Sequence, residues 1–171
     1  MENSRVTWKI SVTGLNGSGK STLISRLVYN TNTVSSQLRP IQRKIVTLDA
    51  RNKRITAELL FLEINSEQES EKLLTGSNCI LVVADLTSIR SLDYAENVLK
   101  FISALNNKTV RVLVATKLDR RYEAQFWQDE LERVSKDYAI PYFILSNNSR
   151  DDWEKLYGYV TDKMIEVFVK K

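Results

Sequence analysis

The chain has 171 residues, of which 43% are hydrophobic and 27% are charged, a balance typical of one ordinary globular domain. The net charge of +4 arises from 25 basic and 21 acidic residues that are scattered along the chain, and this argues against a nucleic-acid-binding face. The sequence contains no histidine and one cysteine, Cys79. This composition excludes histidine bases, histidine metal sites, an internal disulfide and a thiolate metal cluster.

Neither end of the chain carries a recognisable targeting or lipidation signal. No long apolar segment follows Met1, and no apolar run approaches the length of a membrane span. Residue 2 is Glu2 rather than glycine, and the last residues, 169–171, lack a cysteine, so we expect neither myristoylation nor prenylation. The sequence therefore predicts a cytoplasmic protein without a lipid anchor.

Hydrophobic periodicity predicts the elements of the first half of the chain. Residues 6–13 alternate in character and indicate a strand, residues 22–29 indicate a short helix, and residues 30–40 indicate a polar loop. Residues 42–49 and 54–64 are rich in β-forming side chains and flank a short turn, which predicts an antiparallel hairpin.

The second half of the chain repeats a strand followed by a helix. The continuous apolar run at 79–84 predicts a strand buried on both faces of a sheet. The helix after it has an apolar stripe made of Leu92, Ala95, Val98, Leu99 and Ile102. The remaining pairs are a strand at 109–115 with a helix at 122–137, and a strand at 140–145 with a helix at 150–169. This alternation predicts one three-layer α/β domain over residues 1–171, with a six-stranded, mostly parallel sheet and helices on both faces.

A phosphate-binding loop is predicted between the first strand and the first helix. Residues 14–21 read Gly-Leu-Asn-Gly-Ser-Gly-Lys-Ser and match the P-loop pattern at every fixed position. Glycines allow successive N–H groups to point into one concavity, Lys20 can reach the β- and γ-phosphates, and the Ser21 hydroxyl can bind Mg²⁺. The expected phosphate-binding residues are Gly14, Asn16, Gly17, Ser18, Gly19, Lys20, Ser21 and Thr22. Kinases, ATPases and GTPases all carry this motif.

A second motif indicates which base is bound. Residues 115–119 read Ala-Thr-Lys-Leu-Asp at the end of a predicted strand. This segment resembles the guanine-recognition motif of Ras-like small GTPases, and its threonine, Thr116, resembles the Rho branch. The resemblance implies that the Asp119 carboxylate accepts hydrogen bonds from N1–H and the 2-amino group of guanine, a donor pair that adenine lacks. It also implies that the stem of Lys117 lies over the base.

The resemblance to small GTPases covers nearly the whole chain. Residues 80–92 resemble the family's fourth strand and the Asp-x-Thr motif after it, and the phosphate loop is spelled more like that of Arf-like members. Ser146, Asn147 and Asn148 stand in the place of the family's Ser-Ala-Lys loop, which contacts the guanine oxygen. The resemblance implies a P-loop G domain that binds GTP or GDP with Mg²⁺ and contacts protein effectors or regulators through residues 30–45 and 63–75.

The departures from the family lie where hydrolysis and switching would be controlled. Small GTPases carry Asp-x-x-Gly-Gln after the third strand, but the matching positions here read Glu63, Ser66 and Glu67. Glu63 could hold a Mg²⁺-bound water, whereas Glu67 would bring negative charge toward a polyanion, the wrong sign for stabilising the transition state. The Mg²⁺-binding threonine of the first switch should fall near 39–41, which read Arg-Pro-Ile. Thr33, Ser35 and Ser36 are the available substitutes.

The sequence therefore predicts a guanine-nucleotide-dependent switch that hydrolyses GTP slowly or with help from a partner. Lys20 and Glu67 are its candidate catalytic residues. One alternative is a pseudo-GTPase that keeps the fold as a scaffold. Another is a P-loop kinase or ATPase, but this hypothesis leaves residues 116–119 unexplained.

Overall fold

The computed structural model describes residues 4–30, 41–65, 67–105 and 108–169. In chain order the elements are β1 (Ser4–Gly14), α1 (Lys20–Tyr29), β2 (Ile41–Ala50), β3 (Lys53–Ile64), α2 (Glu67–Leu74), β4 (Cys79–Asp85), α3 (Ile89–Ile102), β5 (Val110–Thr116), the 3-10 helix η1 (Leu118–Glu123), α4 (Gln128–Tyr138), β6 (Tyr142–Ile144) and α5 (Arg150–Phe168). The predicted polar loop at 30–40 lies, apart from Asn30, outside the described residues.

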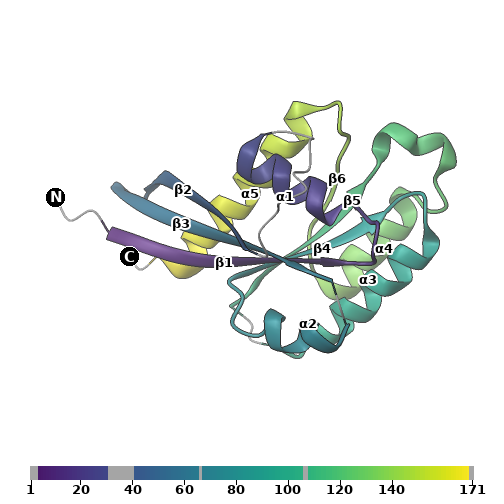
Figure 1. The fold of residues 1–171 in the computed structure, drawn as a ribbon, viewed down its shortest axis with the longest axis horizontal. Coiled ribbons are helices and arrows are strands. Elements are labelled where there is room, and N and C mark those ends of the chain that lie inside the picture. Colours follow the sequence, from purple (N-terminus) through teal and green to yellow (C-terminus); the bar gives the residue numbers. More distant parts are fainter. Residues whose placement is uncertain (1–3, 31–40, 66, 106–107, 170–171) are drawn as a thin grey trace.

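The strands form one six-stranded sheet in the order β2-β3-β1-β4-β5-β6, with helices on both of its faces (Figure 1). The pairing of β2 with β3 is antiparallel, and all other neighbours are parallel. Apolar side chains of α1 and α5 pack in one hydrophobic cluster with the first strand. Side chains of α2, α3 and α4 belong to a second cluster on the opposite face. The predicted fold class is confirmed.

The burial of each strand reflects its place in the sheet. β3 alternates along much of its length, with Ile55, Ala57, Leu59 and Phe61 turned into the α1–α5 layer. Every residue of β4 is buried, because this central strand is covered by helices on both faces. Cys79, at its start, is fully enclosed, and burial raises the pKa of its thiol. The apolar run that predicted a doubly covered strand is thereby explained.

The predicted hairpin is confirmed, and its turn has two residues in the left-handed region. Arg51 has φ 47° and Asn52 has φ 71°, and Ala50 pairs with Lys53 on either side of them. Positive φ at both central positions matches the right-handed twist of the two strands. β2 forms one edge of the sheet.

The predicted helix at 122–137 is wrong over residues 124–127, which lie between two separate helices. Residues up to Glu123 belong to η1, and α4 begins only at Gln128. The segment between them is held by tertiary contacts: the Gln125 N–H donates to the Leu86 carbonyl at 2.9 Å, and its side-chain oxygen accepts from the Ile89 N–H at 2.8 Å. Phe126 is buried in the second cluster. These contacts outweigh a local helical preference that sequence patterns report. The predicted strand at 140–145 is shorter than expected, Tyr142–Ile144.

None of the helices in the described part of the chain is long and apolar enough to cross a membrane.

Candidate functional site

The polar residues singled out in the sequence converge at the carboxyl ends of four parallel strands. The phosphate-binding loop follows β1, Asp85 ends β4, Thr116 ends β5, and Ser146 comes shortly after β6. In open α/β sheets this edge is where ligands bind, because loops leave it and helix N-termini point toward it.

The backbone of the phosphate-binding loop depends on its glycines. Gly17 and Gly19 have φ values of 80° and 101°, a region that residues with side chains avoid. A Cβ on Gly14 would lie 2.6 Å from the Val83 carbonyl oxygen and 2.8 Å from the Ser18 hydroxyl. Gly14 also pairs with Val83 in the sheet, so the close approach is fixed by strand pairing. The loop can therefore hold this shape only with glycine at these positions.

The buried Lys20 side chain bonds back to the start of the phosphate-binding loop. It is 3% exposed, and its Nζ donates a hydrogen bond to the Gly14 carbonyl at 2.7 Å. Burial lowers the pKa of this ammonium, while the nearby Glu63 carboxylate acts in the opposite direction. Burial removes water from this cation, and an anionic ligand would replace the stabilisation that water provided. A buried cation with few partners therefore favours an anionic ligand.

Ser21 and Glu63 bring oxygen ligands together from α1 and β3. The Ser21 hydroxyl lies 2.8 and 2.7 Å from the two carboxylate oxygens of Glu63. A hydroxyl has one hydrogen, so the Ser21 hydroxyl can donate to only one of the two carboxylate oxygens. The other oxygen keeps its lone pairs available beside the hydroxyl. Hydroxyl and carboxylate oxygens are ligands that suit Mg²⁺. The described residues hold no group of three or more acidic, cysteine or histidine side chains, so a magnesium ion here would share phosphate oxygens and water.

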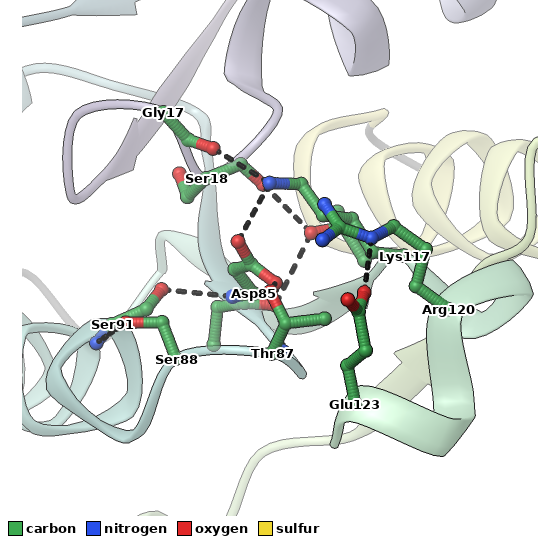
Figure 2. A network of polar contacts seen from close by, with 11 residues as sticks. Gly17, Ser18, Asp85, Thr87, Ser88, Ser91, Lys117, Arg120 and Glu123 are labelled. Carbon is green, nitrogen blue, oxygen red and sulfur yellow. Dashed lines mark hydrogen bonds and ion pairs between the residues drawn. The ribbon is translucent and has the colours of Figure 1, made fainter. Parts of the chain in front are cut away.

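The predicted base-recognition loop is hydrogen-bonded directly to the phosphate-binding loop. The Thr116 hydroxyl donates to the Ser18 carbonyl at 2.7 Å, and Lys117 Nζ donates to the Gly17 carbonyl at 3.0 Å. Figure 2 shows the lysine reaching from its own loop toward Gly17 and Asp85. The two motifs that were identified separately in the sequence therefore form one continuous structure.

A small cavity lies between the phosphate-binding loop, the base loop and the loop after β6. The cavity, of about 50 Å³, is lined by Gly19, Thr22, Thr116, Lys117, Leu145, Asn147 and Trp153. Asp119 is exposed at the first turn of η1, where the neighbouring Leu118 N–H donates to the Leu145 carbonyl at 3.2 Å. The Ser146 hydroxyl accepts from the Asn148 N–H at 3.2 Å, and its carbonyl accepts from Trp153 Nε1 at 2.8 Å. The loop after β6 is thus tied to both the base loop and α5.

For the other predicted site residues the structure gives little more than their position, or does not describe them. Asn16 lies on the exposed part of the phosphate-binding loop. Glu67 is the first residue of α2, without a described side chain, and Ser66 is outside the described residues. Thr33, Ser35 and Ser36 also lie outside them, so the first switch stays a prediction.

Two residues near the site were not assigned to it from the sequence. Asp85 ends the buried run of β4, and a carboxylate at the carboxyl end of a central strand was the available signal. Trp153 lines the cavity and bonds to the Ser146 carbonyl. No sequence signal separated it from an ordinary apolar residue of a core-facing helix.

The fold and the site define a P-loop nucleotide-binding protein. The family model described as "Ras family" matches residues 9–166, which is most of the chain. The protein belongs to the Ras family and is a small GTPase-like nucleotide-binding protein. A comparison with curated proteins gave no significant match.

The close approach at Gly14 generates a testable prediction. Gly14→Ala should lower the free energy of unfolding by about 1–3 kcal/mol, because the added methyl group would overlap backbone that strand pairing holds in place. Chemical denaturation of the ligand-free protein measures this change. Gly158→Ala is the matched control: a Cβ there meets nothing within 4 Å, and its position within α5 makes alanine stabilising by up to about 1 kcal/mol. Equal stability changes in the two variants would contradict the prediction.

Proposed function

We propose that residues 1–171 form a single G domain that acts as a GTP- and GDP-bound molecular switch in the cytoplasm. The observation that carries this proposal is the pair of hydrogen bonds from Thr116 and Lys117 to the phosphate-binding loop. They join residues 116 and 117, which belong to the proposed guanine-recognition motif, to the proposed phosphate-binding loop, and this supports one ligand that contacts both. Membership of the Ras family supports the same ligand, since the family implies guanine nucleotide binding.

Different residues of the chain are proposed to bind different parts of the nucleotide. The N–H groups of residues 14–21 and the start of α1 would hold the β- and γ-phosphates, and Lys20 would add its charge. Asp119 would accept from the two donors of guanine, while Ser146, Asn147 and Asn148 would approach the guanine oxygen. Glu63 and Ser21 would hold Mg²⁺, which supplies charge neutralisation to the phosphates. Carbonyl oxygens at Gly14, Gly17 and Ser18 already have donors, which keeps them turned from the anion.

Hydrolysis is proposed to be slow or partner-dependent. Catalysis of phosphoryl transfer rests on positioning a water and on stabilising developing negative charge. Glu67, the first residue of α2, carries the opposite sign to what that charge needs. We infer that the chain has the groups for holding nucleotide, while Glu67 stands where the family has the glutamine that orients water.

Partners are proposed to bind residues 30–45 and 63–75. Within the first of these segments Ile41 and Ile45 are 50% and 54% exposed on the edge strand β2. Exposed β-branched residues on an edge strand favour contact with another protein. A scaffolding role without nucleotide turnover is the second candidate, and it is favoured by the substitutions at Glu63, Ser66 and Glu67. A nucleotide-independent melting temperature would support a scaffold, because a bound ligand raises stability by mass action.

Lys20→Ala should weaken GDP binding by at least roughly a hundredfold, because a buried charge-assisted contact to phosphate is lost. Calorimetry with GDP and Mg²⁺ measures the affinity. The control is Lys155→Ala, an exposed lysine of α5, which should leave the affinity unchanged. Undiminished binding by Lys20→Ala would contradict the phosphate site, and failure of the unsubstituted protein to bind at millimolar GDP would contradict the proposed function.

Asp119→Asn should reduce the preference for guanine and let xanthine nucleotides compete, because an amide can donate to the xanthine 2-oxo group. Competition between GDP, XDP and ADP measures the preference. Asp162→Asn, an exposed aspartate of α5, is the control and should retain guanine preference. Stronger competition by ADP than by GDP in the unsubstituted protein would instead favour the kinase or ATPase reading.

Single-turnover GTP hydrolysis by the protein alone should be no faster than about 10⁻³ s⁻¹, the order of an unassisted small GTPase. Glu67→Gln should raise the rate by roughly tenfold, because a neutral amide orients water without repelling phosphate. Glu71→Gln, an exposed position of the same helix, is the control for general charge effects. A rate of several per second without a partner would overturn the proposal of slow hydrolysis.

A further inference from the structure

The carboxylate of Asp85 is held in one orientation by the turn that follows β4. Its side chain is 9% exposed. One carboxylate oxygen accepts from the backbone N–H of Thr87 at 2.8 Å and from the Thr87 hydroxyl at 2.7 Å. The backbone N–H of Asp85 donates to the Ser91 hydroxyl at 2.8 Å, and Ser88 caps the N-terminus of α3 beside it. The second carboxylate oxygen is thereby aimed away from its own turn.

That second oxygen receives the ammonium of Lys117. The distance from Lys117 Nζ to Asp85 Oδ2 is 2.7 Å, and the same Nζ lies 3.0 Å from the Gly17 carbonyl (Figure 2). Lys117 itself has φ 65°, a left-handed conformation that is uncommon for a residue with a side chain. Two acceptors, on β4 and on the phosphate-binding loop, therefore hold the ammonium end of an otherwise flexible side chain.

We propose that Asp85 is a positioning residue of the nucleotide site, which holds the stem of Lys117 across the position of the base and locks the base loop to the phosphate-binding loop. The inference rests on the proposed binding of guanine nucleotides. A free lysine side chain loses considerable rotamer freedom when a ligand orders it. Asp85 removes that loss from the binding step because it orders the lysine beforehand.

The charge of Asp85, rather than its shape alone, produces this effect. Burial disfavours the charged carboxylate, but the hydrogen bonds from Lys117 and Thr87 outweigh it and hold the pKa of Asp85 below its ordinary value. The neighbouring cation of Arg120 is directed to Glu123 at 2.5 Å. Lys117 therefore pairs with a carboxylate that is ionised at neutral pH. A neutral amide has a single acceptor oxygen, so it could not accept from both the Thr87 N–H and the Lys117 ammonium.

The test is Asp85→Asn, which keeps the side-chain shape and removes its charge. GDP affinity should fall by roughly ten- to a hundredfold, whereas affinity for pyrophosphate with Mg²⁺ should change by less than about threefold, because pyrophosphate has no base to be covered by Lys117. The control is Asp93→Asn, an exposed aspartate of α3, which should leave both affinities unchanged. Equal losses for GDP and pyrophosphate would overturn the inference, since they would indicate general damage to the site.

A double-mutant cycle with Lys117→Met separates positioning from a purely structural role. Methionine keeps an apolar stem but has no charge, so Asp85→Asn should have no further effect on GDP affinity in that background. The same fold-loss in both backgrounds would overturn the inference, as would an unchanged GDP affinity in Asp85→Asn alone. Absence of GDP binding by the unsubstituted protein would instead be the failure of the proposed function.

If Asp85→Asn does not fold, as judged by circular dichroism and thermal melting, Thr87→Ala takes its place. This variant removes only the hydroxyl that holds the first carboxylate oxygen. It should weaken GDP binding by a few-fold and leave the affinity for pyrophosphate unchanged. In the Lys117→Met background it should have no further effect on GDP affinity. No loss of GDP affinity in this variant would then overturn the inference.

Discussion

The carbonyl oxygens of Gly17 and Ser18 accept hydrogen bonds from residues that follow them by 100 and 98 positions in the chain. A loop that turns its N–H groups inward to meet phosphate must turn its carbonyls outward, and these then need donors. Lys117 and Thr116 supply them from the end of β5. The phosphate nest and the base loop are consequently joined into one hydrogen-bonded structure.

Two charged side chains of the site are incompletely paired. Lys20 is buried against a neutral carbonyl, and burial lowers its pKa. Glu63 directs both carboxylate oxygens at a hydroxyl that has one hydrogen to donate. A polyphosphate would complete the first group, and a divalent cation bound to that phosphate would complete the second. In contrast, the Asp85–Lys117 pair is already complete, which suits a role in holding the site rather than in binding ligand charge.

The binding half of the site is built on the central strands, whereas Glu67 lies beyond the end of β3. Thr116 and Asp85 end strands whose residues are buried throughout or nearly so, so their side chains are positioned by a rigid sheet. Glu67 begins α2 after Ile64, the last residue of β3, outside that rigid frame. This arrangement supports the proposal that the fold itself retains nucleotide and that hydrolysis depends on a partner.

The sequence by itself determined the strand and helix alternation, the phosphate-binding loop and the base motif, because each rests on local spacing: apolar periodicity, glycines at positive φ, and a short run of polar residues after a strand. Only the tertiary structure decided which distant groups meet. Helix α4 begins at Gln128 because Gln125 is held by Leu86 and by the start of α3, and Phe126 by the second core cluster. No local pattern encodes these contacts. Asp85 and Trp153 became site residues for the same reason, since sheet order and helix packing, rather than neighbouring residues, set what they touch.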